Sequence, residues 1–314
     1  MRPPRDQMFS TYGGFSGWTR HLRKNLANYL FIMPALIGVV AFSLGPMIAS
    51  LFLSLTDYDV LSPASYVGLQ NYMELFDDQL FGIALRNTIR YVGATLPLRL
   101  IIALGAAVLL NQQVRGIGVF RTIFYLPSVS AGVAVSLLWQ LIYQPQFGLA
   151  NNLLARIGIR GPAWLGDPQW AMPAIVIMMA LNVGRFMIIF LGGLQTVPTQ
   201  LYEAVQLDGG RGWHQFCYVT LPHLTPVIFF NMVIGMIEMV QMFTQVYVMT
   251  GGGPMDSTLV YVLHIYQKAF QYLEMGYASA LAWVLFLILF ALTMVQFKVS
   301  DRWVYYEAEG DVAK

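Results

Sequence analysis

Six long apolar stretches are the feature of this 314-residue sequence that most limits what it can fold into. A helix needs about 20 mostly apolar residues to cross a bilayer, and none of the six alternates polar and apolar residues as a half-buried strand does. Only 11% of the residues are charged, against about 25% in a soluble domain. We therefore predict an all-α integral membrane protein whose six spans cover residues 29–55, 88–110, 119–142, 170–194, 225–249 and 276–298.

The positive charges predict the orientation of the spans. Six spans put both termini on one side of the membrane, and Lys and Arg collect on the cytoplasmic side. With the N-terminus inside, eleven of these residues fall in inner segments and only Arg156, Arg160 and Lys268 fall in outer loops. We expect a multi-pass protein of a bacterial or archaeal cell membrane with both termini in the cytoplasm. The predicted organisation is a cytoplasmic segment at 1–26, a six-helix membrane domain at 27–300 and a cytoplasmic tail at 301–314.

The inner loop at about 197–223 carries the most information. Pro198 suits the first turn of a helix, and Thr199 and Glu203 stand in capping range. Gly209 supplies the positive φ that ends a helix, and a second short amphipathic helix then runs until Pro222 stops it. The sequence thus predicts two short helices joined by a glycine turn, too polar to cross the bilayer.

These paired helices must rest on another surface. Lipid headgroups are one alternative, but an interfacial helix pair usually carries many Lys and Arg on its polar face. Only Arg211 is present between the two helices. A protein partner with a groove is therefore the favoured interpretation.

The residues of this loop resemble a known signature. Glu203-Ala204-Val205, followed by Asp208-Gly209 and then Leu221-Pro222, is similar to the EAA motif of ABC importer permeases, with Val205 in place of the usual second alanine. The resemblance implies the MetI-like fold of type I importers and a coupling helix that sits in a cleft of a cytoplasmic ATPase. The residues that it assigns to ATPase coupling are Glu203, Ala204, Val205, Asp208, Gly209, Trp213, Phe216, Leu221 and Pro222.

Further motifs resemble the carbohydrate branch of the family, of the MalF/UgpA-like kind. They include Val67-Gly68-Leu69-Gln70-Asn71-Tyr72, Arg86-Asn87-Thr88 and Phe120-Arg121-Thr122-Ile123-Phe124-Tyr125-Leu126-Pro127. The resemblance implies three kinds of partner, a second, MalG-like permease, two ATPase subunits and an extracytoplasmic sugar-binding protein, in addition to the lipid bilayer that the apolar spans require. It also suggests that an outer loop helps to receive the binding protein, through Gly251, Gly252, Gly253 and Pro254.

Sequence patterns of catalysis are missing. No G-x-x-x-x-G-K-[ST] loop is present to cradle phosphates, and the four histidines show no metal-ligand spacing. We expect no enzyme activity, no metal and no cofactor in this chain, with ATP and Mg used by the partner ATPase. One cysteine excludes an internal disulfide, and a net charge of +2 gives no reason to expect a nucleic-acid partner.

Charged residues inside the predicted spans are candidates for a substrate pathway, because burying a charge in lipid costs at least about 2.5 kcal/mol. Asn182 and Arg185 would share one helix face, and Asn231, Glu238 and Gln245 another. The rival interpretation is packing, in which Arg185 and Glu238 pair with each other. For Arg99 packing is favoured. The predicted pathway, placed partly by resemblance to the maltose permease, comprises Met178, Leu181, Asn182, Arg185, Glu238, Gln241 and Gln245.

The sequence therefore predicts the membrane-spanning subunit of an ATP-driven, binding-protein-dependent importer that moves a sugar by alternating access. An ion-coupled secondary carrier is the alternative, although Glu238 is the one acidic residue clearly inside a span. A membrane-embedded enzyme is disfavoured by the missing catalytic motifs. The identity of the sugar, and whether it is charged, stay open.

Overall fold

The computed structural model describes residues 26–112 and 114–305 and divides the chain into two compact units, Met1–Leu53 and Ser54–Lys314. This division falls inside the single membrane domain that the sequence predicts at 27–300. Most of the predicted cytoplasmic segment at 1–26, and the tail from 306 onward, lie outside the described residues.

The first unit contributes one apolar helical span. It consists of α2 (Leu26–Val39), a π-helical turn η2 (Val40–Leu44) and α3 (Gly45–Leu53). The 26 residues of Asn28–Leu53 are long and apolar enough to cross a membrane, which confirms the first predicted span. The amide of Gly45 donates to the carbonyl of Val40, so the helix stays hydrogen-bonded across the wider turn.

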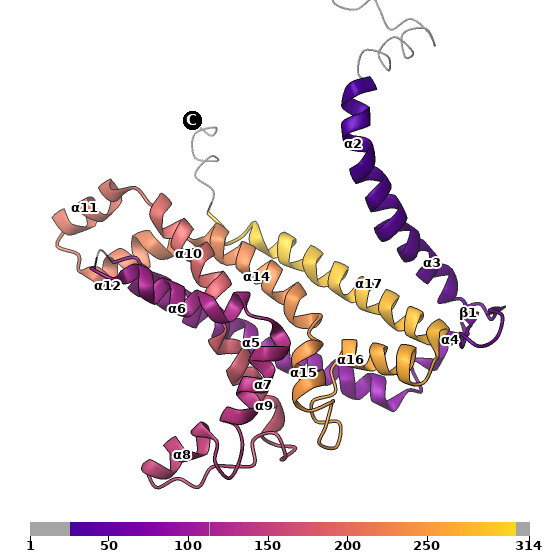
Figure 1. Cartoon of the computed structure of the whole chain (residues 1–314). Coiled ribbons are helices and arrows are strands. Elements are labelled where there is room, and N and C mark those ends of the chain that lie inside the picture. Colours follow the sequence, from indigo (N-terminus) through magenta and orange to yellow (C-terminus); the bar gives the residue numbers. More distant parts are fainter. Residues whose placement is uncertain (1–25, 113, 306–314) are drawn as a thin grey trace, which may run out of the picture. The chain divides into compact units, whose positions relative to one another are not determined.

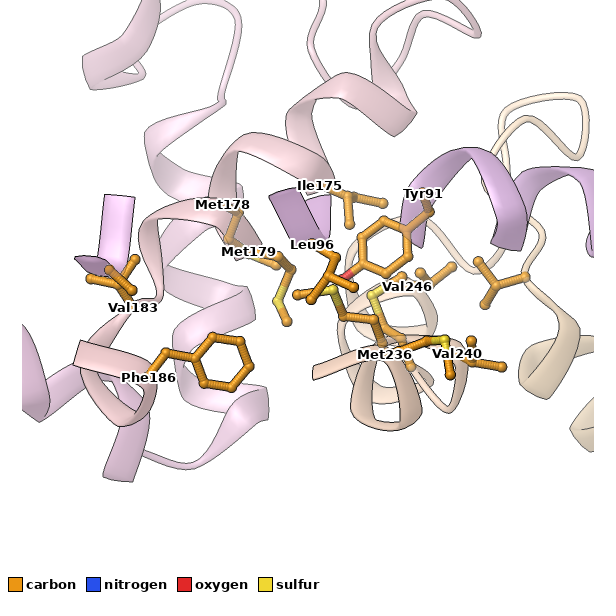
Figure 2. Close-up of a cluster of buried hydrophobic side chains, with 14 of the residues drawn as sticks. Tyr91, Leu96, Ile175, Met178, Met179, Val183, Phe186, Met236, Val240 and Val246 are labelled. Atoms are coloured by element: carbon orange, nitrogen blue, oxygen red, sulfur yellow. The ribbon is translucent and has the colours of Figure 1, made fainter. Parts of the chain in front are cut away.

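Four helices form the packed centre of the second unit. The longest, α5 (Gln79–Leu110), lies against α9 (Ala171–Leu181), α10 (Gly184–Thr196) and α14 (Thr225–Val240) (Figure 1). Figure 2 shows Tyr91, Met178, Phe186 and Met236 from these four helices in one apolar cluster. A methyl group at Gly235 would lie 2.8 Å from Leu96 Cδ1 and from Phe186 Cζ, so glycine is what allows this close helix approach.

Three of the predicted spans contain a break in the helix, although the fourth still counts as one span of 26 residues, Ala171–Thr196. The stretch 119–142 is two helices, α6 (Ile117–Val129) and α7 (Gly132–Ile142), at 103° to each other. The stretch 170–194 breaks between α9 and α10. The stretch 225–249 ends as α14 at Val240 and resumes as α15 (Thr244–Met249). Within the described residues, four helices can cross a membrane, or six if each bent pair counts as one span.

The second and sixth spans are continuous and longer than predicted. The second begins at Gln79 rather than at residue 88, and α17 (Met275–Ser300) extends the predicted 276–298 by three residues. The smaller elements are β1 (Thr56–Asp57), which pairs antiparallel with β2 (Ser65–Tyr66), and the helices α4 (Gln70–Glu74), α8 (Leu149–Arg156), α16 (Tyr261–Tyr266) and η4 (Gln267–Gln271).

Asp78 joins three helices at the end of the second unit that the sequence predicts to face outward. One oxygen, Oδ1, accepts the backbone amides of Leu80 at 2.8 Å and Phe81 at 3.2 Å and so caps α5. The other, Oδ2, accepts from Tyr277 Oη at 2.9 Å and lies 3.0 Å from His264 Nε2. The sequence indicates only an acidic outer loop here, whereas the structure shows one carboxylate that ties α5 to α16 and α17.

The protonation of this cluster predicts a pH effect on stability. Burial lowers the pKa of His264 below 6.5 and outweighs the attraction of Asp78. The unfolded chain therefore binds a proton to this histidine more readily than the folded chain, and stability is lost as pH falls through 6.5. We expect the thermal unfolding midpoint of the purified chain to fall between pH 7.5 and 5.5, and this slope to be smaller in His264→Gln.

Asp78 makes stability depend on pH in a second, more acidic range. Burial would raise its pKa, but hydrogen bonds from Tyr277 and the Phe81 amide, together with His264, hold the pKa below 3.8. Its contribution to stability is present above pH 3.8 and is lost only as pH falls below that value.

The two chains decide whether His264 causes the pH dependence between pH 7.5 and 5.5. If the unfolding midpoint falls equally in the wild-type chain and in His264→Gln over this range, the assignment of the pH dependence to His264 is contradicted.

Candidate coupling surface and translocation site

Helix α11 (Thr199–Leu207) ends in a tight glycine turn. Gly209 has φ +79°, its amide donates to the Gln206 carbonyl at 3.0 Å, and the Gly210 amide donates to the Val205 carbonyl at 2.8 Å. This pair of bonds is the Schellman arrangement, which needs a left-handed residue just past the helix. The glycine turn predicted from the sequence is confirmed. The predicted side-chain capping of the first turn is not, since the N-cap is Pro198 with no side-chain hydrogen bond.

The unusual Val205 is accommodated by Gly210. A methyl group at Gly210 would lie 2.5 Å from Val205 Cγ1 and 2.8 Å from the Val205 carbonyl oxygen. The larger side chain at position 205 therefore fits because residue 210 has none, and the turn keeps its geometry despite the departure from the usual alanine.

The second short helix ends at His223, one residue past the predicted stop at Pro222. It runs through α12 (Gly212–Gln215), the π-turn η3 (Phe216–Thr220) and α13 (Leu221–His223), and then bends by 61° into α14. Pro222 stands in the first turn of α13, where a missing amide proton is tolerated. Two hydrogen bonds tie α11 to this helix: Tyr202 Oη to Thr220 Oγ1 at 3.0 Å, and Gln215 Nε2 to the Tyr202 carbonyl at 3.2 Å.

The surface around the glycine turn is open. Glu203, Ala204, Asp208 and Gly209 are exposed, and Leu207 beside them is 89% exposed. Leu207 is thus a large apolar side chain that the chain leaves uncovered beside a polar turn. Sequence reasoning left Leu207 out of the coupling set, although its position next to Asp208-Gly209 could have indicated it. Figure 1 shows α11 and α12 at the end of α14 opposite to α15.

Trp213 and Phe216 lie near apolar side chains of α5. Their rings stack with centroids 5.7 Å apart. Together with Ile101, Leu104 and Val108 of α5 they line an apolar cavity of about 620 Å³. Leu221 is exposed at 36%. The paired helices thus have a polar face that carries Glu203 and Asp208 and an apolar face that carries Trp213 and Phe216.

Arg99 is the centre of the charged cluster within the spans. Its side chain is 3% exposed and its Nη1 lies 3.6 Å from Glu238 Oε2, whose side chain is 41% exposed. Its Nε donates to the Asn182 carbonyl at 2.8 Å, and its guanidinium lies 4.3 Å from the centroid of the Phe186 ring. The pairing of Glu238 that the sequence left open is therefore with Arg99 rather than with Arg185.

The break between α9 and α10 changes the predicted geometry of the fourth span. Asn182 has ψ 69° and ends α9, so Asn182 and Arg185 do not share a continuous helix face. Arg185 and Leu181 are exposed, whereas Met178 is 1% exposed and lies in the core. In this conformation Met178 offers no surface to a substrate. Phe186, also buried, holds the Arg99 guanidinium instead of an open stacking face.

The polar residues of the fifth span do not form one line. Asn231 is fully buried, and Gln241 borders a cavity of about 390 Å³ between apolar side chains of α16 and α17. Gln245 follows the break after α14, on α15, and its Nε2 would lie 3.5 Å from a methyl group at Gly132 of α7. Asn231 and Glu238 keep their seven-residue spacing on α14, but the expected common face does not extend to Gln245, because the helix ends at Val240.

The glycine run of the outer loop is an ordered turn. Gly251 and Gly252 have φ +61° and +98°, and the Gly253–Pro254 peptide is cis. Thr258 Oγ1 donates to the Gly253 carbonyl at 2.7 Å. Asn87 Nδ2 donates to the carbonyls of Asp256 at 2.8 Å and Leu259 at 3.0 Å, which fixes the turn to α5.

Apolar spans with breaks, a charged cluster at one of the breaks and an exposed helix pair at one end are the features of a multi-pass membrane protein. A family model described as "Binding-protein-dependent transport system inner membrane component" matches residues 117–305. The chain belongs to this family and is a permease subunit of a binding-protein-dependent ABC importer, without ATPase activity of its own.

Individual relatives agree with this family. The chain is 42% identical to a probable ABC transporter permease, YesP, of Bacillus subtilis, over 93% of this chain and 96% of that one. It is 36% identical to the lactose transport system permease LacF of Rhizobium radiobacter, over 86% and 92% of the two chains. It also superposes on a permease chain of a bacterial alginate ABC transporter with a TM-score of 0.78 at 23% identity, over 90% and 96%, which shows the fold.

Proposed function

We propose that this permease subunit carries a carbohydrate across the membrane by alternating access, driven by two ATPase subunits that dock on the turn of α11. The exposed, hydrogen-bonded turn at Leu207–Gly209 carries this proposal. It presents an apolar side chain and a rigid backbone at the end predicted to face the cytoplasm. Relatives that are named for carbohydrate transport, such as the lactose permease, support the substrate class, and the alternative of an ion-coupled carrier has no such support.

The proposed pathway passes the break between α9 and α10. Irregular backbone at membrane depth is tolerated where it is buried in protein or lines a water-filled cavity. The Asn182 carbonyl at this break is held by Arg99, while Leu181, Arg185 and Glu238 are exposed beside it. These residues offer the hydrogen-bonding groups that a sugar needs. The aromatic row of Phe243, Tyr247, Tyr266 and Phe270 offers ring faces nearer the outer end.

Energy enters through the partners. A sugar-loaded binding protein and ATP-bound ATPases would each favour one of two states of the permease pair, and this differential binding shifts the population between them. The second permease is of the MalG-like kind, and ATP and Mg are held by the ATPases. The short helices of α11 and α12, tied together through Tyr202, transmit the motion to α14.

Leu207→Ser tests the docking surface. Burying a leucine side chain contributes about 1.5–3 kcal/mol, so the affinity for the ATPase should fall by roughly 10- to 100-fold. The measurement is the dissociation constant of the ATPase from the detergent-solubilised permease pair. Leu61→Ser is the matched control, because Leu61 is 82% exposed in a loop far along the chain. Equal affinities of the two variants would contradict the proposal.

A further inference from the structure

The ion pair between Arg99 and Glu238 changes the charge balance of the proposed pathway. Glu238 is the acidic residue inside the spans, and its carboxylate is matched by the buried guanidinium of Arg99 at 3.6 Å. Arg99 is held further by the Asn182 carbonyl and the Phe186 ring, so it is fixed in this pairing. Among the described residues, Arg99 is the basic side chain that lies within 4.0 Å of this carboxylate, and Arg185 does not come that close.

Arg185 is left without a counter-charge. Its side chain is exposed on the first turn of α10, in the middle of the 26-residue span Ala171–Thr196. Among the residues that the structure describes it makes no ion pair, although its charge is close enough to act on Arg99. An unpaired guanidinium at this depth is costly in lipid and normally faces a water-filled cavity or an anion. Two guanidinium groups and one carboxylate leave this cluster with one net positive charge.

We propose that the transported saccharide is anionic and that its carboxylate or other acidic group pairs with Arg185. This inference rests on the proposed pathway past the break between α9 and α10. The planar guanidinium presents several N–H donors that match two acidic oxygens at once. The Asn182 Oδ1 atom is buried without a hydrogen-bond partner among the described residues, so it is an acceptor for a sugar hydroxyl in a conformation that uncovers it. A neutral sugar would leave the Arg185 charge unmatched.

The local potential can be measured without knowing the sugar. In a Cys217→Ser background, Leu181→Cys places a thiol at an exposed position four residues before Arg185. The probes are an anionic and a cationic methanethiosulfonate reagent, applied to the assembled complex in proteoliposomes. Adding Arg185→Gln should lower the ratio of anionic to cationic labelling rates by about tenfold, as expected for one unit charge nearby. Arg185→Lys should preserve the ratio.

The outcomes separate this inference from the proposed pathway. If Leu181→Cys is not labelled from water in any state, the pathway itself is wrong and the inference falls with it. If it is labelled but the ratio does not change in Arg185→Gln, the pathway stands and the inference is overturned. That second result is the one expected if an acidic residue of the second permease already neutralises Arg185.

Transport provides the second measurement. Uptake of oligogalacturonate and of its carboxyl methyl ester is compared in the same proteoliposomes, with the ATP hydrolysis rate as the control for assembly. We expect the wild-type complex to prefer the acid. Arg185→Gln should lose at least about tenfold of that preference, whereas Arg185→Lys retains most of it. An equal loss of both substrates in Arg185→Gln would overturn the inference.

Discussion

Replacing Gly209 with proline should reduce sugar uptake by about 100-fold while leaving the spans folded. Gly209 has φ +79°, whereas proline requires a φ near −65°. The substitution also removes the amide that donates to the Gln206 carbonyl. A cost of about 3 kcal/mol or more is expected, and it falls on the turn that we propose to dock on the ATPase. Measurement of uptake in proteoliposomes, together with helix content by circular dichroism, separates uncoupling from unfolding.

Two further glycine variants serve as an intermediate case and a control for Gly209→Pro. Gly209→Ala keeps the amide but places a Cβ in the left-handed region, at a cost of about 1–2 kcal/mol, so uptake should fall by roughly tenfold. Gly212→Ala is the matched control, since a methyl group there meets nothing within 4 Å and its φ is ordinary. We expect it to import at the wild-type rate. If Gly209→Pro imports at that rate as well, the coupling role of α11 is wrong.

Much of the fold could be predicted from the sequence, because a bilayer requires long apolar helices and a glycine turn has a local chemical signature. Four of the six spans, the Gly209 turn and the family are confirmed. The breaks within the spans could not be predicted in this way, because the mean hydropathy of a stretch depends on its composition and not on the direction of its backbone. The break at Gln241–Phe243 contains neither Pro nor Gly, so no helix-breaking residue predicts it. Helical periodicity carried across such a break then gave a wrong common face for Asn231 and Gln245.

Contacts between side chains that are far apart in the chain could also not be predicted from the sequence. Arg99 and Glu238 are 139 positions apart (238 − 99) and meet only because α5 packs against α14. Asp78 could have been identified as the N-cap of α5 from its place before an apolar run. Its contacts with His264 and Tyr277 could not, since they depend on how α16 and α17 return to that helix end. The assignments of residues to ATPase coupling and to the pathway stay predictions.

Replacing Glu238 with glutamine should cost more stability than the exposed position of Glu238 suggests. The substitution leaves the Arg99 charge buried without a counter-ion, and breaking a buried pair costs about 3–5 kcal/mol. Because the Glu238 side chain is 41% exposed, water screens part of the interaction and the lower end is expected. Arg99→Met should lower stability less through its effect on charge, because water can reach the Glu238 carboxylate that remains. The same substitution also removes the hydrogen bond that Arg99 donates to the Asn182 carbonyl.

The double variant Arg99→Met with Glu238→Gln decides whether the pair acts as a unit. Replacing both partners of a buried pair removes the uncompensated charge and is often close to neutral, so the double variant should be more stable than Glu238→Gln alone. The measurement is thermal unfolding of the purified complex, analysed as a double-mutant cycle. Arg86→Met is the matched control, an exposed arginine on the same helix that should change stability by less than about 0.5 kcal/mol. Additive effects of the two substitutions would mean that Arg99 and Glu238 do not depend on each other, and Glu238 would then be free to neutralise Arg185.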